Sequence, residues 1–189
     1  RRVLFRSLIM KKEINVFDYA KEIAKSIGKG VLLTSKADGK VNTMTIGWGT
    51  LGIEWAVPIF TVYVREGRYT RELIDKSMEF TVSIPLGDYD SKITGYCGTH
   101  TGRNQNKIAK AGLTAVEPEI VGAPGFKELP LTIECKVVYK ELQNKNAIDK
   151  TLNDKFYPQD VDSSASGSNR DYHVAYYGKI VKAYIIETK

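Results

Sequence analysis

The chain has 189 residues, of which 42% are hydrophobic and 26% are charged, with a formal net charge of +6 at pH 7. This length and apolar content predict a single folded domain and exclude a disordered chain. Two cysteines, Cys97 and Cys135, are too few for a disulfide scaffold, and no apolar run approaches the 18 residues of a membrane span. We therefore expect a cytoplasmic protein with reduced thiols.

The first nine residues, RRVLFRSLI, precede Met10, which begins a segment typical of a natural start. We interpret residues 1–9 as an expression or sequencing remnant and expect one domain over residues 10–189. Leaving out Arg1, Arg2 and Arg6 lowers the basic residues from 28 to 25 against 22 acidic ones, a net charge of +3. Overall charge then gives little support for nucleic-acid binding.

The N-terminal half predicts a helix followed by strands. Asp18 is expected to cap a helix over Tyr19–Ile27, with apolar side chains at a spacing of four and Gly28 at its end. Two β-rich runs, residues 30–36 and 40–48, flank an Asp-Gly pair and predict a hairpin. A further strand is expected over Pro58–Val64.

The second half continues this alternation of strands and short helices. Thr70 is expected to cap a helix over residues 71–78, and Gly112 to end a helix over residues 103–111. The polar run 163–169 is expected to form a loop. Further strands are expected over residues 79–85, 131–142 and 173–187, the last with a possible bulge at Gly178. We predict a mostly β, barrel-like α+β fold in which closure of an antiparallel sheet would remove its exposed edges.

Two motifs are weaker than they first appear. Residues 47–52 match G-x-G-x-x-G, but the run that follows leads into Pro58 and more strand, where a dinucleotide fingerprint requires a helix. Glycines at a strand corner explain the match better. Cys97 and His100 form a C-x-x-H pair without a second pair to complete a zinc site, and His173 is the only other histidine. We therefore predict no metal ligand and no catalytic side chain.

The run VNTMTIGW is more informative. It places the amide of Asn42 and the hydroxyls of Thr43 and Thr45 beside Met44 and Trp48. Small polar groups next to a flat aromatic ring suit a planar heterocycle. A strand with one polar face is the alternative interpretation.

Two other segments place cations where helices are expected to begin. Arg65, Arg68 and Arg71 surround Thr70, and a second boundary carries Thr101, Gly102, Arg103 and Lys107. Unpaired amides at a helix start attract anions, and cationic side chains add charge-assisted hydrogen bonds. Both segments therefore indicate a phosphate group, with solvated basic turns as the alternative.

Together, these segments resemble the flavin reductase-like, flavoredoxin type of FMN-binding split barrel. The similarity runs in the same order over roughly residues 30–112 and continues more faintly into the last strand. In that family a strand ending near Trp lies along the isoalloxazine ring, an Arg-aromatic-Thr step holds the phosphate, and a Ser-Gly-Arg-x-x-Asp-Lys segment adds flavin contacts. The matching residues here are Asn42, Met44, Thr45, Gly47 and Trp48, then Arg68, Tyr69 and Thr70, then Thr101, Gly102, Arg103 and Lys107.

This sequence departs from the family pattern at two positions. Thr101 replaces the usual Ser and keeps the hydroxyl, whereas Asn106 replaces the usual Asp and removes a carboxylate beside Lys107. The pairing of that lysine is therefore in question.

The resemblance implies a homodimer that binds FMN without a covalent bond, near the subunit interface. It also implies reduction of FMN by NAD(P)H, or electron transfer through FMN to a small-molecule or protein acceptor, with no nucleic acid and no membrane involved. The apolar run Leu51–Phe60 either covers a partner or belongs to the core. Two alternatives remain: a flavin carrier without reductase activity, and a single-stranded nucleic-acid-binding barrel that stacks bases on Trp48 and Tyr69.

Overall fold

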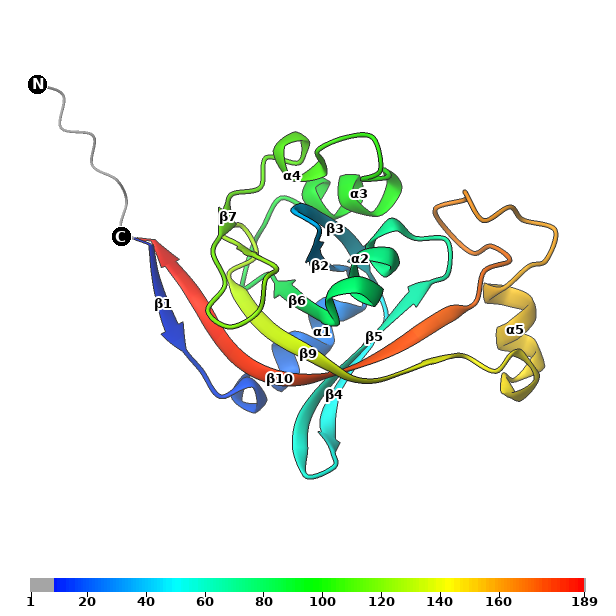
Figure 1. Cartoon of the computed structure of the whole chain (residues 1–189), viewed down its shortest axis with the longest axis horizontal. Helices are drawn as coiled ribbons and strands as arrows, with labels where there is room; N and C mark the ends of the chain where they lie inside the picture. The colour runs from blue at the N-terminus through cyan, green and yellow to red at the C-terminus, as the bar shows by residue number, and fades with distance from the viewer. Residues whose placement is uncertain (1–8, 189) are drawn as a thin grey trace, which may run out of the picture.

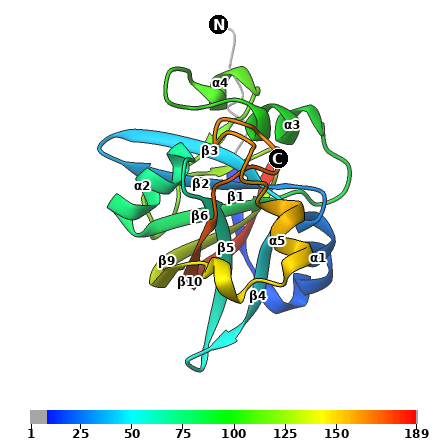
Figure 2. The same cartoon turned by 90° about the vertical axis from the view of Figure 1, so that its right-hand side faces the viewer.

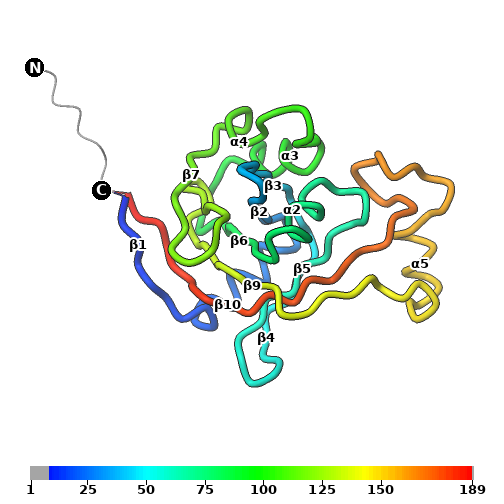
Figure 3. Tube along the Cα trace, in the orientation of Figure 1, coloured from blue at the N-terminus to red at the C-terminus, as the bar shows by residue number. Residues whose placement is uncertain are grey.

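Two long antiparallel strands, β9 (Leu131–Leu142) and β10 (His173–Thr188), cross the middle of the molecule (Figures 1 and 3). A computed structural model of the chain describes residues 9–188. The other strands are β1 (Ile9–Glu13), β2 (Val31–Ala37), β3 (Lys40–Ile46), β4 (Gly49–Glu54), β5 (Val57–Arg65), β6 (Glu79–Ile84), β7 (Ala115–Val116) and β8 (Gly125–Phe126). The helices are α1 (Ala20–Ile27), α2 (Tyr69–Ser77), α3 (Lys92–Thr99), α4 (Lys107–Lys110), α5 (Lys150–Phe156) and the 3-10 turns η1 (Val16–Tyr19) and η2 (Lys145–Ala147).

The main sheet is antiparallel throughout and has the order β3-β2-β6-β9-β10-β5-β4, with β1 also paired to β10. This confirms the predicted mostly antiparallel fold with a few short helices. The sheet is split rather than closed, because β3 and β4 lie at opposite ends of the order. Contacts with α3 and α4 cover β3, so this edge strand is protected without pairing to a closing strand.

One predicted turn and one predicted bulge are confirmed by the backbone. Asp38 and Gly39 both have positive φ angles, 51° and 72°, as a two-residue type I′ hairpin requires. The predicted irregularity at Gly178 is a register shift between β10 and β9. A Cβ atom at this position would lie 2.4 Å from the ring of Phe80 and 2.7 Å from Cβ of Cys135. Only glycine, which has no Cβ atom, therefore fits at this bulge without displacing these core side chains.

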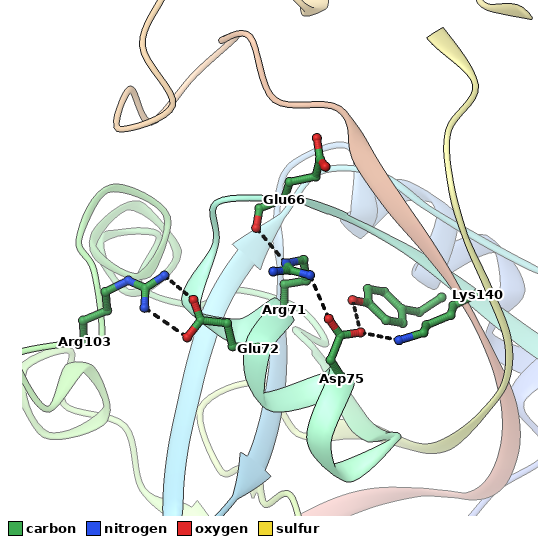
Figure 4. Close-up of polar contacts among 7 residues, drawn as sticks. Glu66, Arg71, Glu72, Asp75, Arg103 and Lys140 are labelled. Atoms are coloured by element: carbon green, nitrogen blue, oxygen red, sulfur yellow. Dashed lines mark hydrogen bonds and ion pairs between the residues drawn. The ribbon is translucent and has the colours of Figure 1, made fainter.

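The core lies between the inner face of the curved sheet and the helices that cover it. Phe60, Phe80 and Tyr176 are among its largest fully buried side chains. Burial of a large apolar side chain contributes roughly 1.5–3 kcal/mol. Tyr176 also donates its hydroxyl hydrogen to Asp75 on α2 at 2.9 Å, which fixes this helix against β10 (Figure 4).

The two predicted N-caps are wrong, for different reasons. Asp18 lies within η1, whose cap is Asn15, and α1 begins at Ala20 without a side-chain cap. Helix α2 begins one residue before Thr70, because the extended Arg68 occupies the cap position. The Thr70 hydroxyl instead accepts a hydrogen bond from Nδ2 of Asn42 at 2.8 Å, so a tertiary contact replaces the cap.

The helix predicted over residues 103–111 is shorter in the structure. Only α4 is helical; Asn106 caps it, and Gly112, with a φ of +69°, follows its C-terminal end. Residues 102–105 form bends instead. Helices α3 and α5 were not predicted, since α3 contains two glycines and α5 has little apolar periodicity.

The predicted N-terminal remnant falls mostly on residues 1–8, which lie outside the described residues. Its last residue, Ile9, is the first residue of β1 and pairs with Thr188. Between residues 9 and 188, none of the helices has both the length and the apolar character needed to span a bilayer.

Candidate functional site

Two adjoining hollows lie where β3 and the start of β10 meet the N-terminal end of α2 and the C-terminal end of α3. The aromatic hollow, of about 240 Å³, is lined by side chains that include Trp48, Tyr63, Phe156 and His173. The polar hollow, of about 110 Å³, is lined by side chains that include Asn42, Thr70, Thr101 and Lys107. Met44, Arg68, Gly98 and Ser166 line both, so the hollows are neighbours. Their combined volume lies near the lower end of the roughly 300–1,000 Å³ typical of ligand pockets.

The structure brings all but one of the predicted site residues to these hollows. Thr45, Gly47 and Trp48 line the aromatic hollow, and Met44 and Arg68 line both. Those that line the polar hollow alone are Asn42, Tyr69, Thr70, Thr101, Gly102 and Lys107. Arg103 lies outside both hollows, where it forms a two-pronged ion pair with Glu72 at 2.5 and 3.0 Å (Figure 4).

The aromatic hollow is built around Trp48. The ring of His173 lies 4.5 Å from the indole, and Phe156 meets the indole edge-on at 5.1 Å. Tyr157 OH lies 2.9 Å from Nδ1 of His173. Burial, together with the nearby charges of Arg65 and Arg68, lowers the pKa of His173 to about 3. The imidazole is therefore neutral at physiological pH, and the ring side chains around Trp48 are uncharged.

Arg68 differs from the other arginines near α2 in what it contacts. Arg71 bonds the carbonyl of Glu66 and the carboxylate of Asp75, as Figure 4 shows. Arg65 is buried and donates to the carbonyls of Phe156, Asn169 and Asp171. Arg68 donates to a single carbonyl, that of Ala165, at 2.7 Å. Since a guanidinium has five N–H donors, Arg68 keeps donors for a ligand between the hollows.

Lys107 supplies the second cation of the polar hollow. It is buried, and its Nζ donates to the carbonyls of Cys97 and His100 at 2.7 and 2.8 Å, near the C-terminal end of α3. These carbonyls take the place of the carboxylate that Asn106 lacks. Burial lowers the pKa of Lys107 to about 8. Because an ammonium group has three donors, one remains for an oxygen atom in the hollow.

In the lining of the polar hollow, the backbone of Gly102 packs closely against the side chain of Asn42. A Cβ atom at Gly102 would lie 1.8 Å from Oδ1 of Asn42, whose Nδ2 donates to Thr70. We expect Gly102→Ala to displace the buried Asn42 amide and break this hydrogen bond. The loss should weaken ligand binding by about 5- to 30-fold, the equivalent of roughly 1–2 kcal/mol.

Isothermal titration of the Gly102→Ala protein with FMN, the ligand that the family resemblance implies, would measure this change, with Gly95→Ala as a control. Like Gly102, Gly95 has no positive φ, but it has open space around its Cβ position and lines neither hollow. Equal losses in the two variants would contradict the role assigned to Gly102.

Several residues of the site were not predicted from the sequence. Tyr63, Phe156 and His173 come from three elements far apart in the chain, and no local pattern links them. The loop predicted over residues 163–169 belongs to the segment that joins α5 to β10 (Figure 2). Its Ser166 lines both hollows. Its buried Asn169 donates to the carbonyls of Ser163 and Ala165, which keeps the loop folded over the site.

The C-x-x-H pair has a structural explanation. Cys97 is buried in α3, and burial raises the pKa of its thiol. His100 stacks on Tyr96 with ring centroids 4.0 Å apart. In the part of the chain from residue 9 to 188, three or more His, Cys, Asp or Glu side chains do not gather into a metal-binding group.

The sequence matches one family model and is similar to two proteins from other organisms. A family model described as a flavin reductase like domain matches residues 25–189. A protein of Archaeoglobus fulgidus is 35% identical over 104 residues, which are 55% of this chain and 57% of that protein. The protein YddH of Escherichia coli is 29% identical over 114 residues, 59% of each chain. The match thus spans less than two thirds of either relative.

Solved structures agree with the split-barrel architecture. The flavoredoxin of Desulfovibrio vulgaris is 25% identical with a TM-score of 0.60, covering 82% of this chain and 68% of that one. An FMN-binding domain of a flavin reductase-like enzyme from Shewanella baltica has a TM-score of 0.62 at 18% identity, covering 95% and 78% of the two chains. At that identity the second similarity concerns the fold alone.

Proposed function

The chain belongs to the flavin reductase-like domain family, and from this premise we propose that it binds FMN and works as an FMN-dependent oxidoreductase. The observation that carries the proposal is the convergence of three separate sequence segments on the two hollows. Residues 42–48, 68–70 and 101–107 lie apart in the sequence, yet each contributes to the same site. A solvated basic turn would require no such convergence.

The donor set fits a flavin monophosphate. Arg68 and Lys107 place two cations at the polar hollow, and Thr70 and Thr101 add hydroxyl groups. Charge-assisted hydrogen bonds from such groups suit a phosphate dianion. The aromatic hollow offers the ring surfaces of Trp48, Tyr63 and Phe156, against which a planar ring system can pack. Bound FMN would supply hydride and one-electron chemistry.

The protein's own side chains then bind, orient and shield the cofactor. Trp48 and its aromatic neighbours limit the space open to a ring, and Ser166, Gly167 and Ser168 of the 163–169 loop line the same hollow. His173 is uncharged over the physiological range and so carries no proton to donate as an imidazolium. We assign no side chain as a catalytic acid or base.

The proposed activity is tested by steady-state oxidation of NADH and NADPH in the presence of FMN. A reductase should consume one of the two nucleotides in proportion to the protein added, and Arg68→Ala should reduce this rate at limiting FMN. Tight FMN binding without oxidation of either nucleotide would favour the flavin carrier and reject the reductase.

We also propose that the protein is a homodimer. Ile53 and Trp55, at the tip of the β4–β5 hairpin, are 63% and 58% exposed. Figure 1 shows this hairpin projecting from the body of the molecule. Trp55 has a positive φ of 51° and lies 6.3 Å from the rings of both Tyr139 and Tyr177. An exposed apolar patch held in a strained turn is typical of an interaction surface.

We expect Trp55→Asp to convert the dimer to a monomer, because a buried carboxylate would lack a partner at the interface. Light scattering coupled to size exclusion would measure the mass. Ile120→Asp is the matched control, since Ile120 is 49% exposed and lies on a loop outside this patch. A wild-type protein that is monomeric with FMN bound would reject the proposal.

A further inference from the structure

A hollow next to the aromatic hollow lies outside the two spaces assigned to FMN. This flanking hollow has a volume of about 410 Å³, and Gly47, Trp48 and Tyr63 line it as well as the aromatic hollow. The two spaces are therefore neighbours, and a molecule in the flanking hollow would lie next to a ring held in the aromatic hollow. The volume is within the roughly 300–1,000 Å³ typical of ligand pockets.

The lining of the flanking hollow is uncharged. Besides the three shared residues, its lining consists of Ile27, Gly28, Gly49, Thr50 and Gln143. Among residues 9–188, the cations of the site, such as Arg68 and Lys107, line the other two hollows instead. A phosphate or carboxylate would have no counter-ion in the flanking hollow, and removing an unpaired charge from water is unfavourable. The flanking hollow therefore suits a neutral molecule.

Gln143 gives this hollow a hydrogen-bond donor of fixed orientation. Oε1 of this half-buried side chain accepts a hydrogen bond from Tyr157 OH at 2.7 Å. The backbone amide of Gln143 donates to the carbonyl of His173 at 3.0 Å, which holds the residue at the start of β10. Because the oxygen end of the side-chain amide is occupied by Tyr157, the two N–H donors of Nε2 remain for a ligand.

The rest of the lining combines a flat aromatic surface with small polar groups. The indole of Trp48 offers an apolar face, and Thr50 and Tyr63 add hydroxyl groups. An uncharged planar molecule with carbonyl oxygens matches this combination, since its ring can pack on the indole and its oxygens can accept hydrogen bonds. Among electron acceptors, quinones have these properties.

We propose that the flanking hollow binds an uncharged quinone as the electron acceptor of the site, with one carbonyl oxygen hydrogen-bonded to Gln143. This proposal rests on the function proposed above and names an acceptor class that this function leaves open. Reduction of a quinone to a hydroquinone takes two electrons and two protons. A hydride from reduced FMN carries two electrons and one proton, water supplies the second proton, and NAD(P)H reduces the FMN again.

Isothermal titration of FMN-loaded protein with duroquinone, whose ring has no free position for reaction with a thiol, tests the proposal. Binding should saturate at one quinone per chain. Gln143→Glu should weaken it by roughly 5- to 30-fold, because the carboxylate still accepts a hydrogen bond from Tyr157 but has no donor for the quinone. The affinity for FMN should stay the same in this variant.

Gln105→Glu is the matched control. Oε1 of Gln105 also accepts a hydrogen bond from a tyrosine hydroxyl, that of Tyr96 at 3.1 Å. Gln105 lines neither the flanking hollow nor the two hollows assigned to FMN. Both variants add one negative charge, so a loss of duroquinone binding in Gln143→Glu alone would identify the donor in the flanking hollow.

The other outcomes overturn the inference in recognisable ways. FMN-loaded protein that does not bind duroquinone, or equal affinities of the two variants for it, would reject the quinone site and leave the FMN site intact. Weaker binding of NAD+ by Gln143→Glu, with unchanged binding of duroquinone, would assign the flanking hollow to the nicotinamide nucleotide instead. Failure of the wild-type protein to bind FMN would reject the function on which the inference rests.

Discussion

Replacement of Arg68 by alanine should lower the affinity for FMN by roughly 10- to 150-fold and leave the affinity for riboflavin much less affected. Arg68 lines both hollows and is the cation at their junction. Removing a charge-assisted hydrogen bond to a partly desolvated phosphate costs on the order of 1.5–3 kcal/mol, which corresponds to this range. Riboflavin has the same ring and no phosphate.

The ratio of the two affinities separates this effect from a change in the loop. Arg68 also holds the carbonyl of Ala165, so its loss could loosen the 163–169 loop and weaken both ligands equally. The ratio isolates the phosphate contact. Arg71→Ala removes an arginine of the same helix that lines neither of the two hollows, and it should leave the ratio unchanged. An unchanged ratio in Arg68→Ala would assign the phosphate to other groups.

Affinity for FMN should fall about tenfold between pH 7 and pH 9, because Lys107 loses its proton in this interval. Burial lowers the pKa of Lys107 to about 8, so the free protein carries this charge at pH 7 and has largely lost it at pH 9. The FMN phosphate, with a second pKa near 6, stays a dianion over the same interval. An anion binds better to the protonated site, and binding therefore raises the pKa of Lys107.

Lys107→Met should give weak FMN binding at pH 7 with little further change up to pH 9. Riboflavin should show little pH dependence in either protein. The stability of flavin-free protein should change in the opposite direction, since the folded-state pKa lies below the ordinary 10.5. Burial of the charged amine opposes folding below pH 8, and this cost is relieved as the pH rises toward 10.5. A flat FMN profile in the wild-type protein would show that Lys107 does not face the phosphate.

Local sequence patterns predicted the sheet well because the decisive interactions there are local. The Asp38-Gly39 turn depends on two residues that tolerate positive φ, and the strand over residues 131–142 has the bounds expected. The bulge at Gly178 was visible as a glycine in a β-rich run. Each of these features is determined by neighbours in the sequence.

The parts that were not predicted depend on distant partners. Thr70 has the residue type of a helix cap, yet its hydroxyl accepts a hydrogen bond from Asn42, 28 residues earlier in the chain. Arg103 pairs with Glu72, 31 residues away, and is drawn out of the two hollows. The pKa of His173 is lowered only in the folded chain, where the side chain is buried and lies near the charges of Arg65 and Arg68. Contacts between residues far apart in the sequence produce no periodic sequence pattern. The residue types therefore indicated the class of ligand, but not where every side chain lies in the fold.

Titration of flavin-free protein with FMN tests the central claim most directly. The absorbance of the flavin should shift and saturate at one FMN per chain, and the midpoint of thermal unfolding should rise with FMN concentration, as expected for a ligand that binds the folded state. Protein denatured after purification with bound cofactor should release flavin mononucleotide. An unshifted flavin spectrum together with an unchanged unfolding midpoint at excess FMN would contradict the assignment of the two hollows to this cofactor.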